Sequence, residues 1–286
     1  MDRQQRLKAA LSPSQPDRHR VISVLSGKGG VGKSVIAYNL AERAKDYGLR
    51  TLLVDADLSS GNIHVLANLA PEHNLWEYAV ERLSLKDTVV TTSSGLEILA
   101  APSAGTVVET LDTRTTAKLF ARLYDQTRDY DLIVIDHSSG VSKSATVLAS
   151  ASDLCLLIVI PELTSIHDGY GLWKYLFESN TSIDCRLLLN RVNSEEETRY
   201  VRSRFTEVAE KFLGKAPGFI GSLPEDEAVR QAVARQVPIA GAVSQSPVVQ
   251  VLDAFIQVYA GRSTQPVSAN PSKTVNNHPA TADIRE

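Results

Sequence analysis

The chain alternates between short, almost uncharged apolar runs and longer stretches in which apolar residues recur at helical spacing. The short runs are rich in β-branched residues, which is typical of strands that a parallel sheet buries on both faces. They cover residues 21–25, 51–54, 96–100, 132–135, 154–160, 186–189 and 219–220. The helical stretches between them include residues 115–125, 165–178, 195–212 and 226–235. This alternation predicts an α/β fold with a doubly wound, mostly parallel sheet flanked by helices, with ligands at the carboxyl ends of the strands.

A glycine-rich loop follows the first predicted strand and opens a helix that we expect to end near Gly48. Residues 27–34 read GKGGVGKS and match the phosphate-binding pattern G-x-x-x-x-G-K-[ST]. In that pattern backbone N–H groups surround the phosphates, Lys33 reaches the terminal phosphates and the Ser34 hydroxyl holds Mg²⁺. The helix N-terminus adds a dipole that favours anions. The predicted nucleotide-binding residues of the loop are Gly27, Lys28, Gly29, Gly30, Val31, Gly32, Lys33, Ser34 and Val35.

Lys28 is a second cation inside the loop, which the ordinary pattern does not require. Water alone does not neutralise two positive charges held on one short loop, so an anionic ligand is expected there. Lys28 therefore indicates a nucleoside triphosphate, and one that is reached from a second subunit.

Three carboxylates follow predicted strands at the edge where this loop lies. Asp55 and Asp57 end the second strand, where burying acids is costly unless a cation is near. We expect Asp55 to face the Mg²⁺ site through water and Asp57 to orient an attacking water; a turn-forming pair of acids is the alternative. Asp136 ends the strand LIVID and is expected to hold Mg²⁺ directly or through its water shell. The predicted metal-site residues are therefore Ser34, Asp55 and Asp136.

The loop that follows Asp136 reads HSSG. Gly140 is placed to let the backbone approach a γ-phosphate. His137 is either a solvated loop residue or a hydrogen-bonding group near the phosphate, and the sequence leaves both readings open.

Composition narrows the class of protein. The chain has 286 residues, 43% of them hydrophobic, with a net charge of −3, so no global basic field favours nucleic acid as a partner. Its two cysteines, Cys155 and Cys185, fall inside apolar runs and are expected to be buried free thiols. Neither a signal peptide nor a membrane span is evident, so we expect a cytoplasmic protein.

Three regions differ in composition. Residues 1–20 predict an N-terminal helix or arm, residues 21–261 the α/β domain, and residues 262–286 a disordered tail rich in Ser, Thr, Pro and Asn. The last predicted helix, SPVVQVLDAFIQVYAG, is apolar over a broad arc and has no lysine. Core packing is therefore expected for it, and a basic amphipathic membrane anchor is not evident.

Taken together, these segments resemble the MinD/ParA group of P-loop ATPases, often called deviant Walker A ATPases. The resemblance covers residues 21–261 and rests on GKGGVGKS, DADLSSGN, DYDLIVID, PELTSIHDGY, LLLNRVNS and LPEDEAVRQAV in this order. It implies a slow ATPase that uses ATP and Mg²⁺ and forms an ATP-bound homodimer.

The resemblance also implies roles for single residues. Lys28 matches the lysine that crosses to the phosphates of the partner subunit, and Lys33 matches the P-loop lysine; with Asp57 they form the predicted catalytic set. Asn190 and Arg191 match the adenine-side motif, and the Asn-Lys-x-Asp sequence of a common guanine site is absent there. The predicted switch residues are Asp57, Asn62, Asp136 and Gly140.

Within the group, the segments PELTSIHDGYGL and LPEDEAVRQAVARQVPI are similar to the flagellar-number regulators of the FlhG (FleN) type. That similarity implies a partner such as an FlhF-like GTPase or a flagellar C-ring component, bound through residues 2–11 or the dimer surface. It also implies recruitment to a cell pole or the inner membrane through partners. The alternatives are a weakly hydrolysing adaptor for a secretion or polar complex, and a ParA-like ATPase that partitions DNA or cargo.

Overall fold

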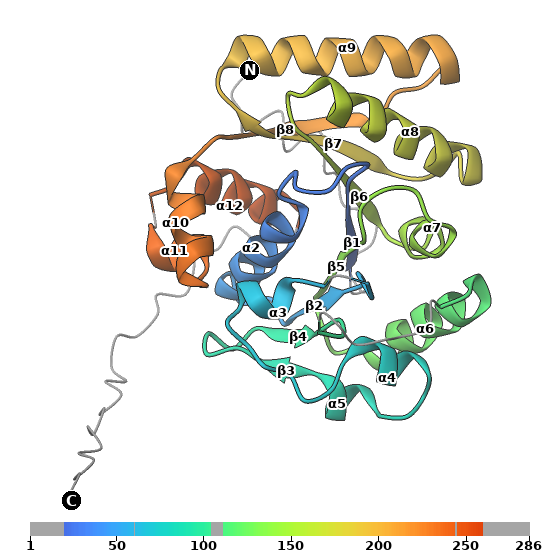
Figure 1. Cartoon of the computed structure of the whole chain (residues 1–286), viewed down its shortest axis with the longest axis vertical. Coiled ribbons are helices and arrows are strands. Elements are labelled where there is room, and N and C mark those ends of the chain that lie inside the picture. Colours follow the sequence, from blue (N-terminus) through green and yellow to red (C-terminus); the bar gives the residue numbers. More distant parts are fainter. Residues whose placement is uncertain (1–19, 60, 104–110, 244, 260–286) are drawn as a thin grey trace, which may run out of the picture.

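The computed structural model describes residues 20–59, 61–103, 111–243 and 245–259 (Figure 1). Eight strands form one sheet with the order β3-β4-β2-β5-β1-β6-β7-β8. All neighbouring strands run parallel except β3, which pairs antiparallel with β4. The strands are β1 Arg20–Leu25, β2 Thr51–Asp55, β3 Val90–Thr91, β4 Glu97–Leu99, β5 Leu132–Asp136, β6 Leu154–Val159, β7 Cys185–Val192 and β8 Gly218–Pro224.

Helices cover both faces of this sheet, as the sequence predicts (Figure 1). On one face lie α2 Lys33–Asp46, α3 Ile63–Leu66, α10 Glu227–Arg235, α11 Ile239–Ala242 and α12 Pro247–Tyr259. On the other lie α4 Leu75–Ala79, α5 Leu85–Thr88, α6 Thr113–Gln126, α7 Lys143–Ser150, α8 Leu163–Ser179 and α9 Glu195–Leu213. The five residues of β5 are all buried, because a central strand lies between both layers of helices.

The C-terminal helix α12 belongs to the core. Its apolar residues Val248, Val249, Leu252, Phe255 and Ile256 are all buried against α2 and β8. Across this contact Arg43 of α2 forms an ion pair with Asp253 of α12. The prediction that this helix packs in the core is therefore confirmed.

Strand β3 was not predicted from the sequence. It has only two residues, too few to show an alternation of apolar and polar positions. Cys155 and Cys185 are buried and free, as expected. No helix among the described residues has the length and apolar character needed to cross a membrane. The predicted N-terminal helix or arm, residues 1–20, lies outside the described residues except for Arg20, which begins β1, and the predicted tail lies outside them entirely.

Candidate nucleotide-binding site

The glycine loop joins β1 to α2 at the carboxyl edge of the sheet, as predicted. Gly30 and Gly32 have φ angles of 78° and 89°, in the left-handed region where a side chain is strained. Gly27 is required for a different reason: a Cβ at this position would lie 2.1 Å from the carbonyl oxygen of Asp168 in α8. Gly27 therefore lets the loop touch the backbone of α8, a contact that the motif alone does not reveal.

Behind the loop, Lys33 and Asp136 form a buried ion pair. The Lys33 Nζ lies 2.6 Å from Asp136 Oδ1, and the side chains are 8% and 1% exposed. Burial raises the pKa of the Asp136 carboxyl, and the adjacent Lys33 ammonium opposes that rise. The second oxygen, Oδ2, is buried without a hydrogen-bond partner among the described residues. Sequence reasoning brought these two residues to one site, and the structure joins them directly.

Asp55 lies beside Asp136 in the register of β2 and β5. Its Oδ1 accepts the N–H of Asp57 at 3.2 Å, and its Oδ2 accepts the N–H of Ile63 at 3.1 Å. Burial, followed by the nearby Asp136 charge, raises the pKa of Asp55 to about 7. In this structure Asp55 thus holds the loop that follows β2, and its role at the metal stays a prediction.

The same loop depends on Gly61, which sequence reasoning missed. A Cβ at Gly61 would lie 2.7 Å from Asp55 Oδ2 and 2.2 Å from the Cβ of Ala101. Further along, the Ser59 hydroxyl donates to Asp57 Oδ1 at 2.8 Å, and the exposed Asn62 occupies the N-cap position of α3. Only the position of Gly61 beside a predicted switch residue hinted at its importance.

The loop after β5 runs against β1. Gly140 has a φ of 86° and donates its N–H to the carbonyl of Ser26 at 2.9 Å, which holds it close to the glycine loop. His137 is 1% exposed, so the reading of a solvated loop residue is wrong. Its Nε2 lies 2.7 Å from Ser23 Oγ, and burial lowers its pKa to about 3, which keeps the ring neutral at pH 7.

Lys28 is held at the rim by its own chain. Its Nζ lies 2.7 Å from Glu162 Oε2 and donates to Thr164 Oγ1 at 2.9 Å. These partners stand at the start of α8, and the Lys28 side chain is 36% exposed. Sequence reasoning did not find Glu162, although it directly follows Pro161 in one of the segments that carry the family resemblance.

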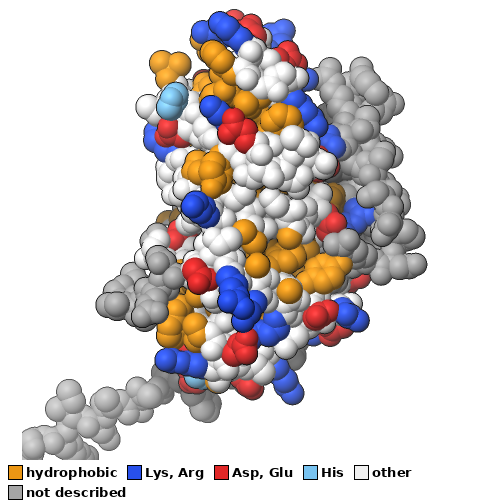
Figure 2. Space-filling model, turned by 90° about the vertical axis from the view of Figure 1, so that its right-hand side faces the viewer, with side chains coloured by type: hydrophobic (Ala, Val, Ile, Leu, Met, Phe, Trp, Pro, Cys, Tyr) orange, Lys and Arg blue, Asp and Glu red, His pale blue; other side chains and the backbone are white. Residues whose placement is uncertain are grey.

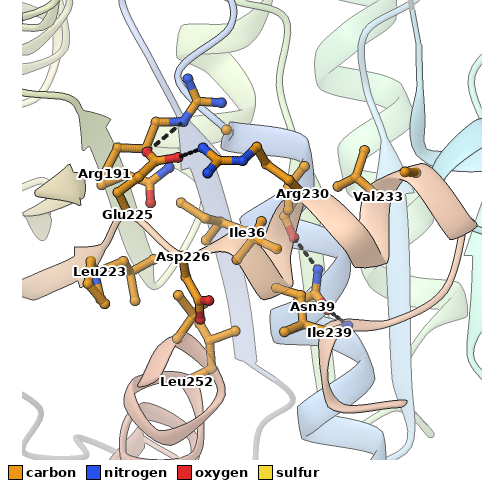
Figure 3. Close-up of a pocket in the computed structure, with 17 residues that line it drawn as sticks. Ile36, Asn39, Arg191, Leu223, Glu225, Asp226, Arg230, Val233, Ile239 and Leu252 are labelled. Carbon is orange, nitrogen blue, oxygen red and sulfur yellow. Dashed lines mark hydrogen bonds and ion pairs between the residues drawn. The ribbon is translucent and has the colours of Figure 1, made fainter. Parts of the chain in front are cut away.

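A cavity of about 290 Å³ lies beside the loop, on the face covered by α2, α10 and α12 (Figure 3). Glu225 bridges Arg191 and Arg230 along one side of it, with N–O distances of 3.8 Å and 2.6 Å. Its apolar walls include Val35, Ile36, Leu223, Val229, Ile239 and Leu252. An apolar cavity with a few polar groups at its side suits a heteroaromatic base.

Asn190 and Arg191, the predicted adenine-side residues, both line this cavity. The Asn190 amide donates to the carbonyl of Val31 at 2.8 Å, so it braces the glycine loop. A Cβ on Gly32 would lie 2.5 Å from that same amide nitrogen. Arg191 has a φ of 56°, in the left-handed region that non-glycine residues adopt at some cost in free energy.

These residues fit Mg²⁺ and a nucleoside triphosphate. Asp136 Oδ2 is a buried carboxylate oxygen that lacks a hydrogen bond from the described residues, and Lys33 and Ser34 stand beside it. Among the described residues no three His, Cys, Asp or Glu side chains cluster as a metal site. Mg²⁺ is usually held by one or two protein oxygens together with substrate phosphates, and Ser34 and Asp136 offer such oxygens.

Known proteins with similar sequences also carry a nucleotide-binding domain of this kind. Residues 19–187 match the family described as AAA domain. The chain is 34% identical over 252 residues to the antiactivator FleN of Pseudomonas aeruginosa, covering 88% of this chain and 89% of the relative. The chain belongs to the MinD/ParA family of P-loop ATPases.

Two further MinD/ParA proteins extend the comparison. The flagellum site-determining protein YlxH of Helicobacter pylori is 23% identical, covering 75% of this chain and 72% of the relative. The septum site-determining protein MinD of Pyrococcus horikoshii, solved with Mg-ADP, has a TM-score of 0.68 at 23% identity, covering 84% and 95% of the two chains. The chain, a P-loop ATPase by family, shares the fold of this MinD.

Proposed function

We propose that this ATPase is a slow, ATP-dependent dimerisation switch. The observation that carries the proposal is the position of Lys28, which is held outward by Glu162 and Thr164 at the rim of the loop. A cation placed there can reach the phosphates of a second copy across a shared edge. Moving such a switch from mostly monomer to mostly dimer takes about 5.5 kcal/mol of differential binding. Charge-assisted contacts made only in the dimer supply energy of this kind.

The chain's own residues divide the work of hydrolysis. Lys33 exchanges Asp136 for the terminal phosphates, which frees the Asp136 carboxylate for the metal. Mg²⁺ would be held by Ser34 and Asp136 and would neutralise developing charge on the phosphate oxygens. Asp57 orients the attacking water, and Gly140 lets the backbone of the loop after β5 approach the γ-phosphate. Loss of the γ-phosphate then removes the anion that holds Lys28 of the partner copy.

The cellular role that we propose is control of the number or placement of an assembly, with flagella favoured. Two relatives support this choice, an antiactivator and a flagellum site-determining protein. Docking of an FlhF-like GTPase or a C-ring component through residues 2–11 or the dimer surface belongs to this proposal. So does a cytoplasmic protein that partners recruit to a pole or to the inner membrane.

A DNA-partitioning role has less support. Figure 2 shows acidic and basic side chains intermixed over one face of the molecule. On α9, the exposed Arg204 pairs with Glu207, so this helix presents mixed charges to solvent. Sequence-independent DNA binding needs a continuous basic surface. A salt-dependent shift of nonspecific DNA would favour partitioning instead.

The test is light scattering after size exclusion on Asp57→Ala, with and without Mg-ATP. We expect a doubling of mass with ATP and retained ATP binding, because Asp57 serves hydrolysis and not the P-loop. Lys33→Ala is the control that should bind no ATP and stay monomeric. An Asp57→Ala protein that binds ATP and keeps the monomer mass would contradict the proposal.

A further inference from the structure

Two large apolar side chains are exposed to solvent on either side of the glycine loop. Strand β1, which leads into this loop, lies between β5 and β6 in the sheet. Val141, in the loop after β5, is 51% exposed, and Leu163, the first residue of α8 after β6, is 81% exposed. No other large apolar side chain among the described residues is as exposed as Leu163. The edge of the sheet that carries the glycine loop therefore also carries apolar surface.

Leu163 is presented by a firmly held start of α8. The N–H of Ile160 donates to Ser165 Oγ at 3.1 Å, and Ser165 is buried. Further along the helix, the backbone of Asp168 packs against Gly27 of the glycine loop. Both contacts fix the first turns of α8 to the rest of the domain. The exposure of Leu163 is therefore a property of an anchored helix and not of a loose loop.

Val141 is presented in the same way. Before it, Gly140 donates its N–H to the carbonyl of Ser26 at 2.9 Å, which ties the loop to the chain leading into the glycine loop. After it, the Ser142 hydroxyl accepts the N–H of Ala145 at 3.0 Å and caps α7. The neighbours of Val141 on both sides are thus held in place. A surface that is already ordered loses little conformational entropy when a partner covers it.

Leu163 is also next to the cation that the proposed switch uses. It stands between Glu162 and Thr164, the two residues that hold Lys28 Nζ at 2.7 Å and 2.9 Å. A lysine side chain is short, so a second copy whose phosphates Lys28 reaches must also contact the neighbours of Lys28. A two-fold interface brings the same residues of both copies together, with an apolar centre and a polar rim. Apolar side chains beside a Lys–Glu pair have this composition.

We propose that Leu163 and Val141 are the apolar anchors of the ATP-bound homodimer, and that a second copy of this chain buries both of them. The inference rests on the proposed dimerisation switch and specifies the surface on which the two copies meet. The phosphates attract Lys28 and decide when the dimer forms. Burial of the two apolar side chains of each copy decides how tightly the dimer holds, because removing apolar surface from water is favourable.

The small size of these anchors explains why they need the nucleotide. A stable interface between two proteins buries roughly 1,200–2,000 Å² in total. Four side chains, two from each copy, supply only part of that area. The apolar contacts therefore do not hold the copies together once hydrolysis removes the phosphate that attracts Lys28.

The experiment introduces one reactive thiol at the proposed anchor. Cys155 and Cys185, the only cysteines of the chain, are 0% and 3% exposed, so Leu163→Cys supplies the thiol that a maleimide reaches. In full-length Asp57→Ala protein at concentrations where light scattering shows a doubled mass, Mg-ATP should slow its labelling at least about tenfold, because only the dissociated fraction reacts. Dilution should restore the rate. Ser179→Cys, at the exposed far end of α8, is the matched control and should be labelled equally with and without ATP.

Serine variants measure how much each anchor contributes. In the same Asp57→Ala background, Leu163→Ser should weaken ATP-dependent dimerisation roughly thirtyfold, because each dimer loses two buried leucines. Val141→Ser should weaken it less, roughly fivefold, since valine is smaller and half-covered already. ATP binding to the monomer should persist in both, because neither side chain lines the base-side cavity. Phe212→Ser removes an exposed apolar side chain at the end of α9 and is the control that should leave dimerisation unchanged.

The results separate this inference from the switch proposal. A doubled mass with Mg-ATP, together with labelling of Leu163→Cys at the monomer rate, would overturn the inference and leave the switch standing. Protection without a change in mass, or protection that dilution does not relieve, would assign it to a movement within one chain and would overturn the inference as well. Unchanged dimerisation in Leu163→Ser would do the same. If Asp57→Ala binds ATP and keeps the monomer mass, the switch and its anchors fall together.

Discussion

The Lys28 ammonium lies 2.7 Å from the carboxylate of Glu162, at the start of α8 in its own chain. In the proposed dimer, Lys28 must leave Glu162 to reach the phosphates of the other copy. The strength of this ion pair therefore enters the equilibrium between monomer and dimer. Because both side chains are substantially exposed, the pair contributes little, at most about 1 kcal/mol.

Glu162→Gln should therefore tighten ATP-dependent dimerisation roughly two- to fivefold, since it frees Lys28 at small cost. The measurement is analytical ultracentrifugation in the Asp57→Ala background with Mg-ATP. Glu178→Gln, on the same helix and facing Lys174, is the control that should have no effect. Weaker dimerisation in Glu162→Gln would instead mean that Glu162 itself holds the second copy.

Gly27→Ala should disrupt the contact between the glycine loop and α8. A Cβ there would lie 2.1 Å from a backbone oxygen, which cannot move as a flexible side chain can. We expect loss of ATP binding and a destabilisation of roughly 2 kcal/mol or more. Fluorescent-nucleotide titration and urea unfolding check both parts. Gly171→Ala in the same helix meets nothing within 4 Å and should be neutral or stabilising by about 1 kcal/mol.

Lys33→Met should destabilise the nucleotide-free protein as well as abolish ATP binding. Removing one partner of a buried ion pair leaves the Asp136 charge uncompensated, which costs about 3–5 kcal/mol. Adding Asp136→Asn to Lys33→Met should recover much of that stability without restoring ATP binding. Urea unfolding of the two variants measures this, and equal stabilities would show that the pair carries no such coupling.

The carboxyl of Asp55 should make stability depend on pH. Its pKa is raised to about 7, so the folded protein binds a proton that the unfolded chain releases near its ordinary value of 3.8. The stabilisation is complete below that ordinary value and is lost as the pH rises toward and through about 7. We expect the melting temperature without nucleotide to fall by several degrees, roughly 3–8 °C, between pH 5 and pH 8.

Asp55→Asn should flatten that slope, even though the amide replaces one hydrogen-bond acceptor and lowers the starting stability. Differential scanning calorimetry across the pH range is the measurement. Asp125→Asn changes an exposed carboxyl on α6 and should keep the wild-type slope. A slope that persists in Asp55→Asn would assign the effect to other groups.

The sequence predicted much of this molecule because its signals are local. The run LIVID reads as a buried strand, and GKGGVGKS needs its glycines and cations close together in the chain. His137 could not be placed this way, since its partner Ser23 is 114 positions away on β1. The contact of Gly27 with α8 is equally remote, because only packing of the helix onto the loop creates it.

Arg20 at the start of β1 donates to the carbonyl of Tyr259 at the end of α12 and stacks over its ring at 4.8 Å. The described fold therefore begins and ends at one point, at the amino end of the central strand and away from the nucleotide edge. A short linker between these two residues would give a circular permutant with new ends in a surface turn. Such a permutant should keep the ATP site, which makes the terminal segments separable from the ATPase for genetic study.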